Sequence, residues 1–140
     1  MYQKIIIVGN LGRDPEMRYL PDGTAVTSFS MATSRRWTNP STGEPGEETT
    51  WFRVNVWRRQ AETVNQYLTK GSKVLVEGYL KPDPNTGGPR LWTRQDGTVG
   101  ASFEITADTV RFLSGREDAG GYAGPEQGGA PAQEEDEIPF

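Results

Sequence analysis

Residues 49–80 read TTWFRVNVWRRQAETVNQYLTKGSKVLVEGYL, and the fold prediction rests on this segment. Aromatic and apolar side chains alternate with polar ones over 49–58, which predicts a strand. The more polar run 60–69 suits a short helix, and the β-branched run 73–80 follows it directly as another strand. The segment therefore contains a strand, a helix and a strand with very short connections.

The helix expected over 60–69 has one apolar face. Ala61, Val64 and Leu68 are spaced i, i+3 and i+7, which places them together on the surface of a helix. The pair Lys70-Gly71 supplies the stop, because glycine commonly ends a helix. A single short helix of this kind cannot cover an open sheet of five strands.

The rest of the body is also predicted to be strands and turns. The Pro/Gly/acid segment 38–48 is predicted to be a loop. The Pro/Gly-rich segment 82–100 is predicted to be a protruding hairpin with Leu91-Trp92-Thr93 in its middle. Turns are expected at Arg13-Asp14-Pro15 and Pro21-Asp22-Gly23. Three further runs of strand-forming residues are bounded by such turns: 4–8, 25–34 and 102–112.

The predicted order is three strands, one helix and two strands. The connections are too short for parallel crossovers, which need a dozen or more residues. Closing the sheet on itself covers its core and removes its edges. We therefore predict an all-β protein with one short helix, built as a five-stranded Greek-key barrel of the OB type, which has this order of elements.

Composition limits the chemistry available to this chain of 140 residues. It contains no cysteine and no histidine, which removes disulfides, thiol nucleophiles, the commonest general base and the commonest metal ligand. Catalysis would have to use carboxylates, Lys, Tyr or Ser, and nothing in the sequence positively supports it. We expect a protein without enzymatic activity, cofactor or metal.

The net charge of −4 is unevenly distributed. Residues 1–113 carry 14 basic and 12 acidic side chains, whereas residues 114–140 carry one Arg and seven acids. The whole-chain charge argues weakly against a nucleic-acid partner. A mildly basic body with an acidic tail is a different kind of molecule from a uniformly acidic one.

The composition also predicts three segments. Residues 1–113 are expected to form one folded domain. Residues 114–133 are rich in Gly and Pro and poor in large apolar side chains, so they are expected to be a disordered linker. Residues 134–140 are expected to be a separate acidic tip.

The tip reads Glu-Glu-Asp-Glu-Ile-Pro-Phe. An acidic run that ends in two apolar residues around a proline is typical of a peptide ligand, whose apolar side chains fill a pocket while basic groups hold the acids. A solubilising tail is the alternative, although such a tail would not need this apolar end. The residues expected to bind a partner protein are Asp136, Glu137, Ile138, Pro139 and Phe140.

Residues 51–57 carry the main functional signal. Side chains alternate between the two faces of a strand, so Phe52, Val54 and Val56 share one apolar face. The other face holds Trp51, Arg53, Asn55 and Trp57, which is neither an ordinary core nor an ordinary solvated surface. Two indoles on either side of a guanidinium suit single-stranded nucleic acid, because bases stack on aromatic rings and arginines bind phosphates. Packing at a subunit interface or under a loop is the alternative for these tryptophans.

Two more tryptophans favour the binding interpretation. Trp37 follows Arg35 and Arg36, and Trp92 lies between Arg90 and Arg94. Basic residues after the 49–58 strand and around the helix extend the pattern, although each alone could be a solvated side chain. The predicted nucleic-acid-binding set is Trp37, Trp51, Trp57, Trp92, Arg35, Arg36, Arg53, Arg58, Arg59, Lys70, Lys73, Arg90 and Arg94.

Other motifs carry less weight. Val8-Gly9-Asn10-Leu11-Gly12 is similar to a dinucleotide-binding loop, but it lacks the third glycine and no long helix follows. Asp83, Asp96 and Asp108 lack the close spacing of a metal site. The apolar N-terminal run is too short for a signal peptide or a membrane span, so we expect a soluble protein of the cytoplasm that makes no contact with membranes.

The sequence resembles the bacterial single-stranded DNA-binding protein (SSB) family over essentially the whole chain. No single motif is decisive, but their combination is highly specific. The matching segments are 7–19, 32–34 with Trp37, 50–54, 67–74, 76–78 and the tip 136–140.

The resemblance implies an OB fold that assembles as a homotetramer and is associated with the nucleoid. It implies base stacking on Trp37, Trp51, Trp57 and Trp92, and a tip that recruits enzymes of DNA replication, recombination and repair. The chain departs from the family at two positions. Trp57 stands where Phe is common, and Phe52 stands where many members have a His that is linked to tetramer contacts.

The sequence therefore leaves three candidate functions. The favoured one is sequence-tolerant binding of single-stranded DNA with a partner-recruiting tail. An OB-fold RNA-binding module would use the same aromatic residues but prefer RNA through contacts to the 2′-hydroxyl. A small carboxylate-dependent hydrolase is disfavoured because the body has no clustered acids.

Overall fold

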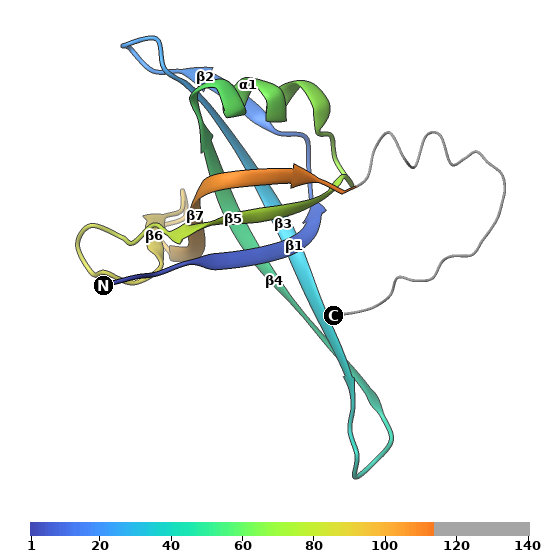
Figure 1. Ribbon diagram of the computed structural model, residues 1–140. Helices are drawn as coiled ribbons and strands as arrows, with labels where there is room; N and C mark the ends of the chain where they lie inside the picture. The colour runs from blue at the N-terminus through green and yellow to red at the C-terminus, as the bar shows by residue number, and fades with distance from the viewer. Residues whose placement is uncertain (114–140) are drawn as a thin grey trace, which may run out of the picture.

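The computed structural model describes residues 1–113, which form seven strands and one helix (Figure 1). In chain order the elements are β1 (Ile5–Leu11), β2 (Glu16–Tyr19), β3 (Ala25–Thr38), β4 (Pro45–Trp57), α1 (Arg58–Tyr67), β5 (Lys73–Leu80), β6 (Arg90–Thr93) and β7 (Val99–Phe112). The predicted linker 114–133 and tip 134–140 lie outside the described residues.

Five of the strands close into a barrel, as the sequence predicts. The order β1-β5-β7-β4-β3 is completed by pairing of β3 back to β1, with Asn10 opposite Ala32 and Leu11 opposite Met31. The architecture is an OB fold, and β2 and β6 are added outside the ring, on β3 and β7. Closure leaves the barrel without a free edge.

One barrel pair differs from the prediction of a sheet without parallel strands. β4 and β7 run parallel, from Phe52 opposite Phe103 to Asn55 opposite Thr106. The two strands are not joined by one short crossover. α1, β5 and β6 all lie between them in the chain, so the connection is long enough to return β7 in the same direction.

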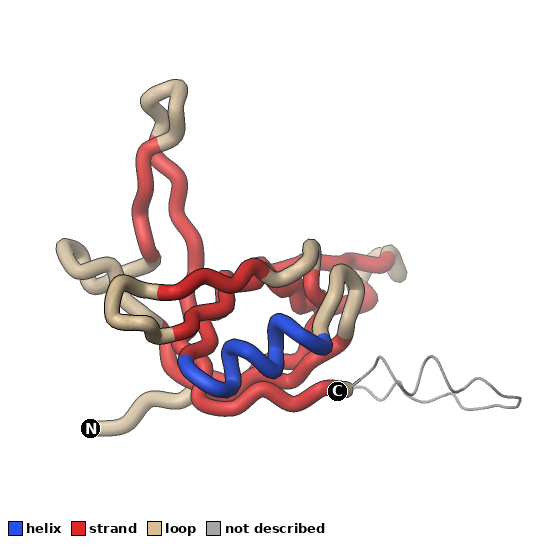
Figure 2. The backbone as a smooth tube through the Cα atoms, turned by 90° about the horizontal axis from the view of Figure 1, so that it is seen from above, coloured by secondary structure: helices blue, strands red, loops and turns tan. Residues whose placement is uncertain are grey.

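The helix α1 covers one end of the barrel (Figure 2). Ala61, Val64 and Leu68, the predicted apolar face, are all buried, and Val64 and Leu68 join the core formed by the strands. The Thr27 hydroxyl donates a 2.6 Å hydrogen bond to the carbonyl of Ala61, which ties α1 to β3. This end of the barrel is therefore closed by packing.

The predicted loop 38–48 is a turn only over residues 39–44, because its two ends belong to a two-stranded ribbon. β3 and β4 stay paired beyond the barrel as far as Thr38 opposite Pro45, and they form an arm that projects from it (Figure 1). Only residues 39–44 turn the chain, with Gly43 at a φ of 77°. The Gly and Pro content disguises the strand, because cross-strand ion pairs replace apolar alternation here.

Other boundaries also differ from the prediction. β1 continues through Gly9 to Leu11, because the missing Cβ lets the Ala32 carbonyl approach that backbone closely. β2 is not among the predicted strands, because its alternation of polar and apolar side chains covers only four residues between two turns. The 73–80 strand and the hairpin within 82–100 are confirmed, the latter formed by β6 and the start of β7.

Candidate functional site

The outward face of β4 is the centre of the site. Val54 and Val56 are fully buried, whereas Trp51, Arg53 and Trp57 on the alternate face are exposed. The period-two interpretation of residues 51–57 is therefore confirmed. The strand presents aromatic and basic side chains outward from a rigid barrel wall.

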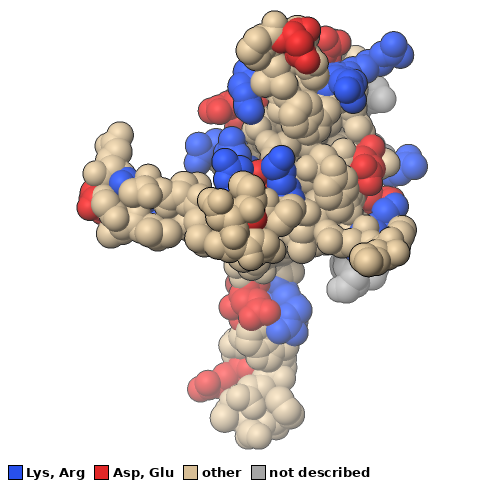
Figure 3. Space-filling view, turned by 90° about the vertical axis from the view of Figure 1, so that its left-hand side faces the viewer, with Lys and Arg blue, Asp and Glu red and all other residues tan. Residues whose placement is uncertain are grey.

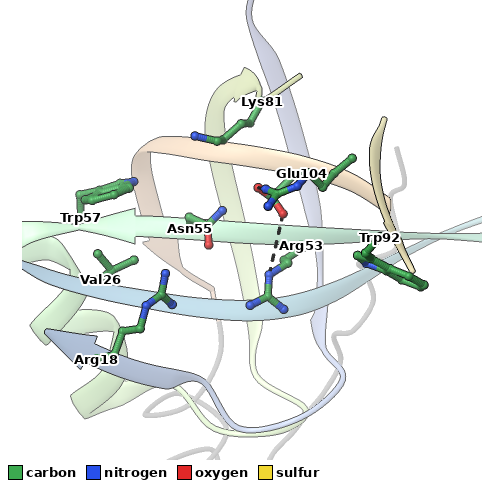
Figure 4. Close-up of a pocket in the computed structure, with 9 residues that line it drawn as sticks. Arg18, Val26, Arg53, Asn55, Trp57, Lys81, Trp92 and Glu104 are labelled. Carbon is green, nitrogen blue, oxygen red and sulfur yellow. Dashed lines mark hydrogen bonds and ion pairs between the residues drawn. The ribbon is translucent and has the colours of Figure 1, made fainter. Parts of the chain in front are cut away.

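A groove of about 420 Å³ runs across this wall. Figure 4 shows Trp57 and Trp92 at its two ends, with Arg53 and Asn55 between them. The structure thus brings together residues that are distant in the sequence, from β2, β3, β4, β6 and β7 and from the residue after β5. The lining residues are Arg18, Val26, Arg53, Asn55, Trp57, Lys81, Arg90, Trp92 and Glu104.

Glu104 of β7 is the one acid that lines this groove. Its buried carboxylate pairs with two arginines through different oxygens, with Arg90 Nη1 at 3.3 Å from Oε1 and Arg53 Nε at 3.9 Å from Oε2. Both arginine side chains remain nearly half exposed. The carboxylate therefore orients two guanidinium groups while leaving much of each available to an anion.

Asn55 is held in one orientation on the groove floor. The Ser28 hydroxyl donates a 2.8 Å hydrogen bond to Asn55 Oδ1. The amide NH₂ of Asn55 is left as a donor. Together with the basic side chains, this donor favours ligands that present acceptor oxygens, such as phosphates and base carbonyls.

Sequence reasoning missed Arg18, Lys81 and Glu104. Arg18 pairs across strands with Val26, and Val26 pairs with Trp57. The three residues therefore lie side by side on neighbouring strands, which places Arg18 at the groove. Lys81 is placed by its backbone N–H, which donates to the Glu104 carbonyl at 2.7 Å. Only the pairing register could have identified these residues, because none lies near a tryptophan in sequence.

The β6 hairpin that carries Trp92 is anchored by Asp83. The buried Asp83 carboxylate accepts hydrogen bonds from the backbone N–H groups of Leu91, Asn85 and Thr86. These bonds, the one from Leu91 first, hold the pKa of Asp83 below its usual range. Asp83 is thus a turn-organising residue that fixes where β6 leaves the barrel.

The arm carries a second group of predicted residues. The Arg35 guanidinium carbon lies 5.0 Å from the centroid of the Trp37 ring. Arg35 and Arg36 also pair across the ribbon with Glu48 and Glu47, at 2.8 and 3.3 Å. Figure 3 shows basic side chains gathered over the barrel, whereas on the arm basic and acidic groups lie side by side.

The remaining predicted residues are spread more widely. Trp51 lies against Gly12 near the base of the arm, and the Arg94 guanidinium carbon is 4.7 Å from the centroid of the Trp92 ring. Arg59 lines another cavity, beside α1, with Arg111 and Phe112. The groove lining does not include Arg58, Arg59, Lys70 or Lys73.

Neither a cluster of metal ligands nor a membrane-spanning helix is present in the described part of the chain. Residues 1–113 contain no group of three or more acidic side chains that could hold a metal ion. Asp96 instead accepts hydrogen bonds from the N–H and hydroxyl of Thr98, which lower its pKa. Within the same residues, no helix has the length and apolar character needed to cross a bilayer.

Comparison with known proteins gives consistent matches. The family model described as "Single-strand binding protein family" matches residues 2–113. The chain is similar to the Plasmodium falciparum SSB in its complex with ssDNA, with 26% identity, a TM-score of 0.65 and coverage of 81% of this chain and 96% of that chain. It is also similar to a deletion mutant of the single-stranded DNA binding protein from Thermus aquaticus, with 28% identity, a TM-score of 0.63 and coverage of 83% of this chain but 52% of that chain.

Proposed function

Because the chain belongs to the single-strand binding protein family, we propose that its barrel binds single-stranded DNA without sequence preference and without catalysis. Bases stack on the exposed tryptophans, and the basic groups between them neutralise phosphates. The bound strand is thereby kept unpaired and protected during replication, recombination and repair.

The groove in Figure 4 carries this proposal. Two indoles stand at its ends, and four basic side chains, Arg18, Arg53, Lys81 and Arg90, line it together with one acid. A duplex hides the faces of its bases, so only a single strand can use both kinds of group at once. Each stacked base contributes roughly 1–3 kcal/mol to affinity, whichever base it is.

Base stacking is also the stronger of two competing ring contacts. Arg35 lies over the Trp37 ring and Arg94 over the Trp92 ring. At exposed sites such a cation–π contact is worth about 0.5–1 kcal/mol, which is less than the roughly 1–3 kcal/mol of a stacked base. We therefore expect a base to replace the guanidinium over each ring, while Arg35 keeps its ion pair with Glu48 and Arg94 its hydrogen bonds to Thr98 and Val99.

The test is a titration of intrinsic tryptophan fluorescence with oligo-dT at two salt concentrations. Oligo-U and duplex DNA serve as controls for RNA binding and for general phosphate attraction. We expect strong quenching by oligo-dT and weaker responses to both controls. Four basic side chains and one acid line the groove, which leaves a net of three positive charges. A plot of log affinity against log salt concentration should therefore have a slope of about −2, at about −0.7 per neutralised phosphate of a single strand.

Two variants sharpen this test. Trp57→Ala should weaken oligo-dT binding by about 1–3 kcal/mol, because one stacking ring is lost. Tyr19→Ala removes an exposed aromatic ring from β2 that does not line the groove, and should bind as the wild type does. Equal quenching by oligo-dT and oligo-U would favour the RNA-binding alternative. Absence of quenching by every ligand would contradict the proposal.

The proposal extends to assembly and to partner proteins. The family resemblance implies a homotetramer, and exposed apolar side chains on the barrel strands, among them Ile6 and Phe103, are suited to contacts between copies. Residues 136–140 are proposed to bind enzymes of DNA metabolism. These finer points rest on the sequence resemblance.

A further inference from the structure

Two tryptophans face a glycine directly across a strand pair. Trp37 of β3 is opposite Gly46 of β4, and Trp92 of β6 is opposite Gly100 of β7. At both glycines, the position that a Cβ atom would occupy is already taken by atoms of the indole ring. The two rings therefore lie over bare backbone.

A third tryptophan has the same arrangement without being a cross-strand partner. A Cβ atom at Gly12 would come within 2.6 Å of Cζ3 and 2.8 Å of Cη2 of Trp51. Trp57 is the exception, because its cross-strand partner is Val26, a residue with a side chain. Three of the four tryptophans thus rest on glycine.

We propose that Gly12, Gly46 and Gly100 are positioning residues for DNA binding, each holding one indole against the backbone so that its other face is presented to a base. The inference rests on the proposed function and adds residues that touch no DNA. Trp37, Trp51 and Trp92 remain 42%, 53% and 45% exposed, and Trp57, which has no such glycine, is 36% exposed. The glycines therefore do not account for the exposure of the rings; they fix which part of each ring lies against the backbone.

We call each of these three glycines a seat, because an indole ring lies against its bare backbone. A seat improves binding by preorganising the ring. An exposed indole on a side-chain-bearing strand samples several rotamers, and a base that stacks on it must first restrict them. A ring that already lies on backbone has lost that freedom during folding. Glycine is the one residue that permits this close approach, because it lacks a Cβ atom.

The backbone at these positions tolerates alanine. None of the three glycines has a positive φ, and the atoms nearest to the added methyl group belong to the indole, a side chain that can swing away. Gly78 is different, because a Cβ there would meet the carbonyl oxygen of Thr106. Alanine at the three seats should therefore displace a ring and leave the barrel folded.

The experiment uses the full chain and centres on Gly100→Ala. We expect roughly a three- to thirtyfold loss of affinity for oligo-dT, since part of one stacked base is lost. Gly88→Ala in the same hairpin is the matched control, because its new methyl group would have only an ordinary 3.6 Å contact with Thr86. That control should bind within twofold of the wild type, and both variants should keep the wild-type melting temperature.

A double-mutant cycle separates positioning from a general structural effect. If Gly100 acts through Trp92, Gly100→Ala should cost nothing further in a Trp92→Ala background. Gly46→Ala with Trp37→Ala provides an independent second cycle on the arm. An equal loss in both backgrounds would overturn the inference, as would wild-type affinity of Gly100→Ala.

A measurement without DNA distinguishes failure of this inference from failure of the proposed function. In a chain whose other three tryptophans are replaced by Phe, Gly100→Ala should raise acrylamide quenching of Trp92 emission, because the covered ring face becomes accessible. Unchanged quenching would overturn the seat itself. If Gly100→Ala raises the quenching but the wild-type chain does not bind oligo-dT, the contact between ring and glycine is confirmed and its role in DNA binding is overturned.

Discussion

The carboxylates of Glu104 and Asp83 near the groove hold other groups in position. Glu104 is buried among basic side chains, and it orients Arg53 and Arg90 across two strands. Asp83 positions the backbone, because its two carboxylate oxygens accept hydrogen bonds from three amide N–H groups where the β6 hairpin leaves the barrel. The acid in this groove is thus already paired with basic groups, so it is compatible with the phosphate binding proposed there.

Asp83→Asn should release the β6 hairpin. One carboxylate oxygen becomes an NH₂ group, which cannot accept from Leu91 N–H or from the other two amides. We expect faster amide hydrogen exchange at Leu91 and weaker oligo-dT binding, since Trp92 loses its fixed place. Asp22→Asn, which alters a similar turn contact with Thr24, should leave both properties of the hairpin unchanged.

The same bonds predict how the wild-type hairpin responds to acid. The folded pKa of Asp83 is lowered, so its contribution is fully present above the ordinary carboxyl pKa of about 3.9. That contribution is lost as the pH falls below this value and through the folded pKa. Leu91 protection should therefore be constant from pH 7 to about 4, and a decline already near pH 6 would contradict the assignment.

At the scale of elements, the junction between β4 and α1 positions one end of the groove. β4 ends at Trp57, and α1 begins at the next residue without a loop. Arg58 makes this turn with a φ of 63°, the only positive φ of a non-glycine residue within 1–113. An L-residue pays roughly 1–2 kcal/mol for this conformation, and the tightness of the turn keeps Trp57 at the groove end.

Arg58→Gly should therefore stabilise the barrel, by about 0.5–1 kcal/mol once the greater freedom of glycine in the unfolded chain is included. Arg59→Gly is the matched control. It removes the same charge one residue later, inside the helix, and should cost about 1 kcal/mol. Urea unfolding of both variants measures the difference, and destabilisation by both would contradict the strain at Arg58.

At the scale of the whole molecule, opposite charges lie on different parts of the chain. Residues 1–113 are mildly basic, and residues 114–140 carry seven acids against one Arg. Residues 134–140 hold four of those acids. We expect this tethered acidic segment to compete with DNA for the basic groups of the barrel, because a tether raises the effective concentration of a linked group.

Deletion of residues 134–140 should therefore tighten oligo-dT binding at low salt. We expect a several-fold gain at about 20 mM salt that fades above about 300 mM, where charges are screened beyond a few ångströms. A variant that replaces the four acids with Gln or Asn but keeps Ile-Pro-Phe tests whether charge is responsible. Unchanged affinity of the deletion variant at low salt would exclude the competition.

Much of the fold could be predicted because its signals are local. Alternation over residues 51–57 and the spacing of Ala61, Val64 and Leu68 are set by backbone periods of 2 and 3.6 residues, and burial follows both patterns. Because one short helix cannot cover an open sheet, the order of strands and helix then predicted a closed barrel. The tryptophans and the arginines next to them could be predicted as candidate binding residues for the same reason, since each pair is close in sequence.

The partners of those residues depend on strand pairing, which a single sequence does not display. Lys81 and Glu104 reach the groove because barrel closure sets the register of β5 and β7, and Arg18 reaches it because β2 pairs with β3 outside the ring. In the arm and in the β6 hairpin, both outside the ring, strand pairing puts Gly46 under Trp37 and Gly100 under Trp92. Side-chain periodicity is a property of a few consecutive residues, whereas strand register is a property of the folded sheet, so the sequence predicted the candidate binding residues and tertiary structure decided which groups lie beside them.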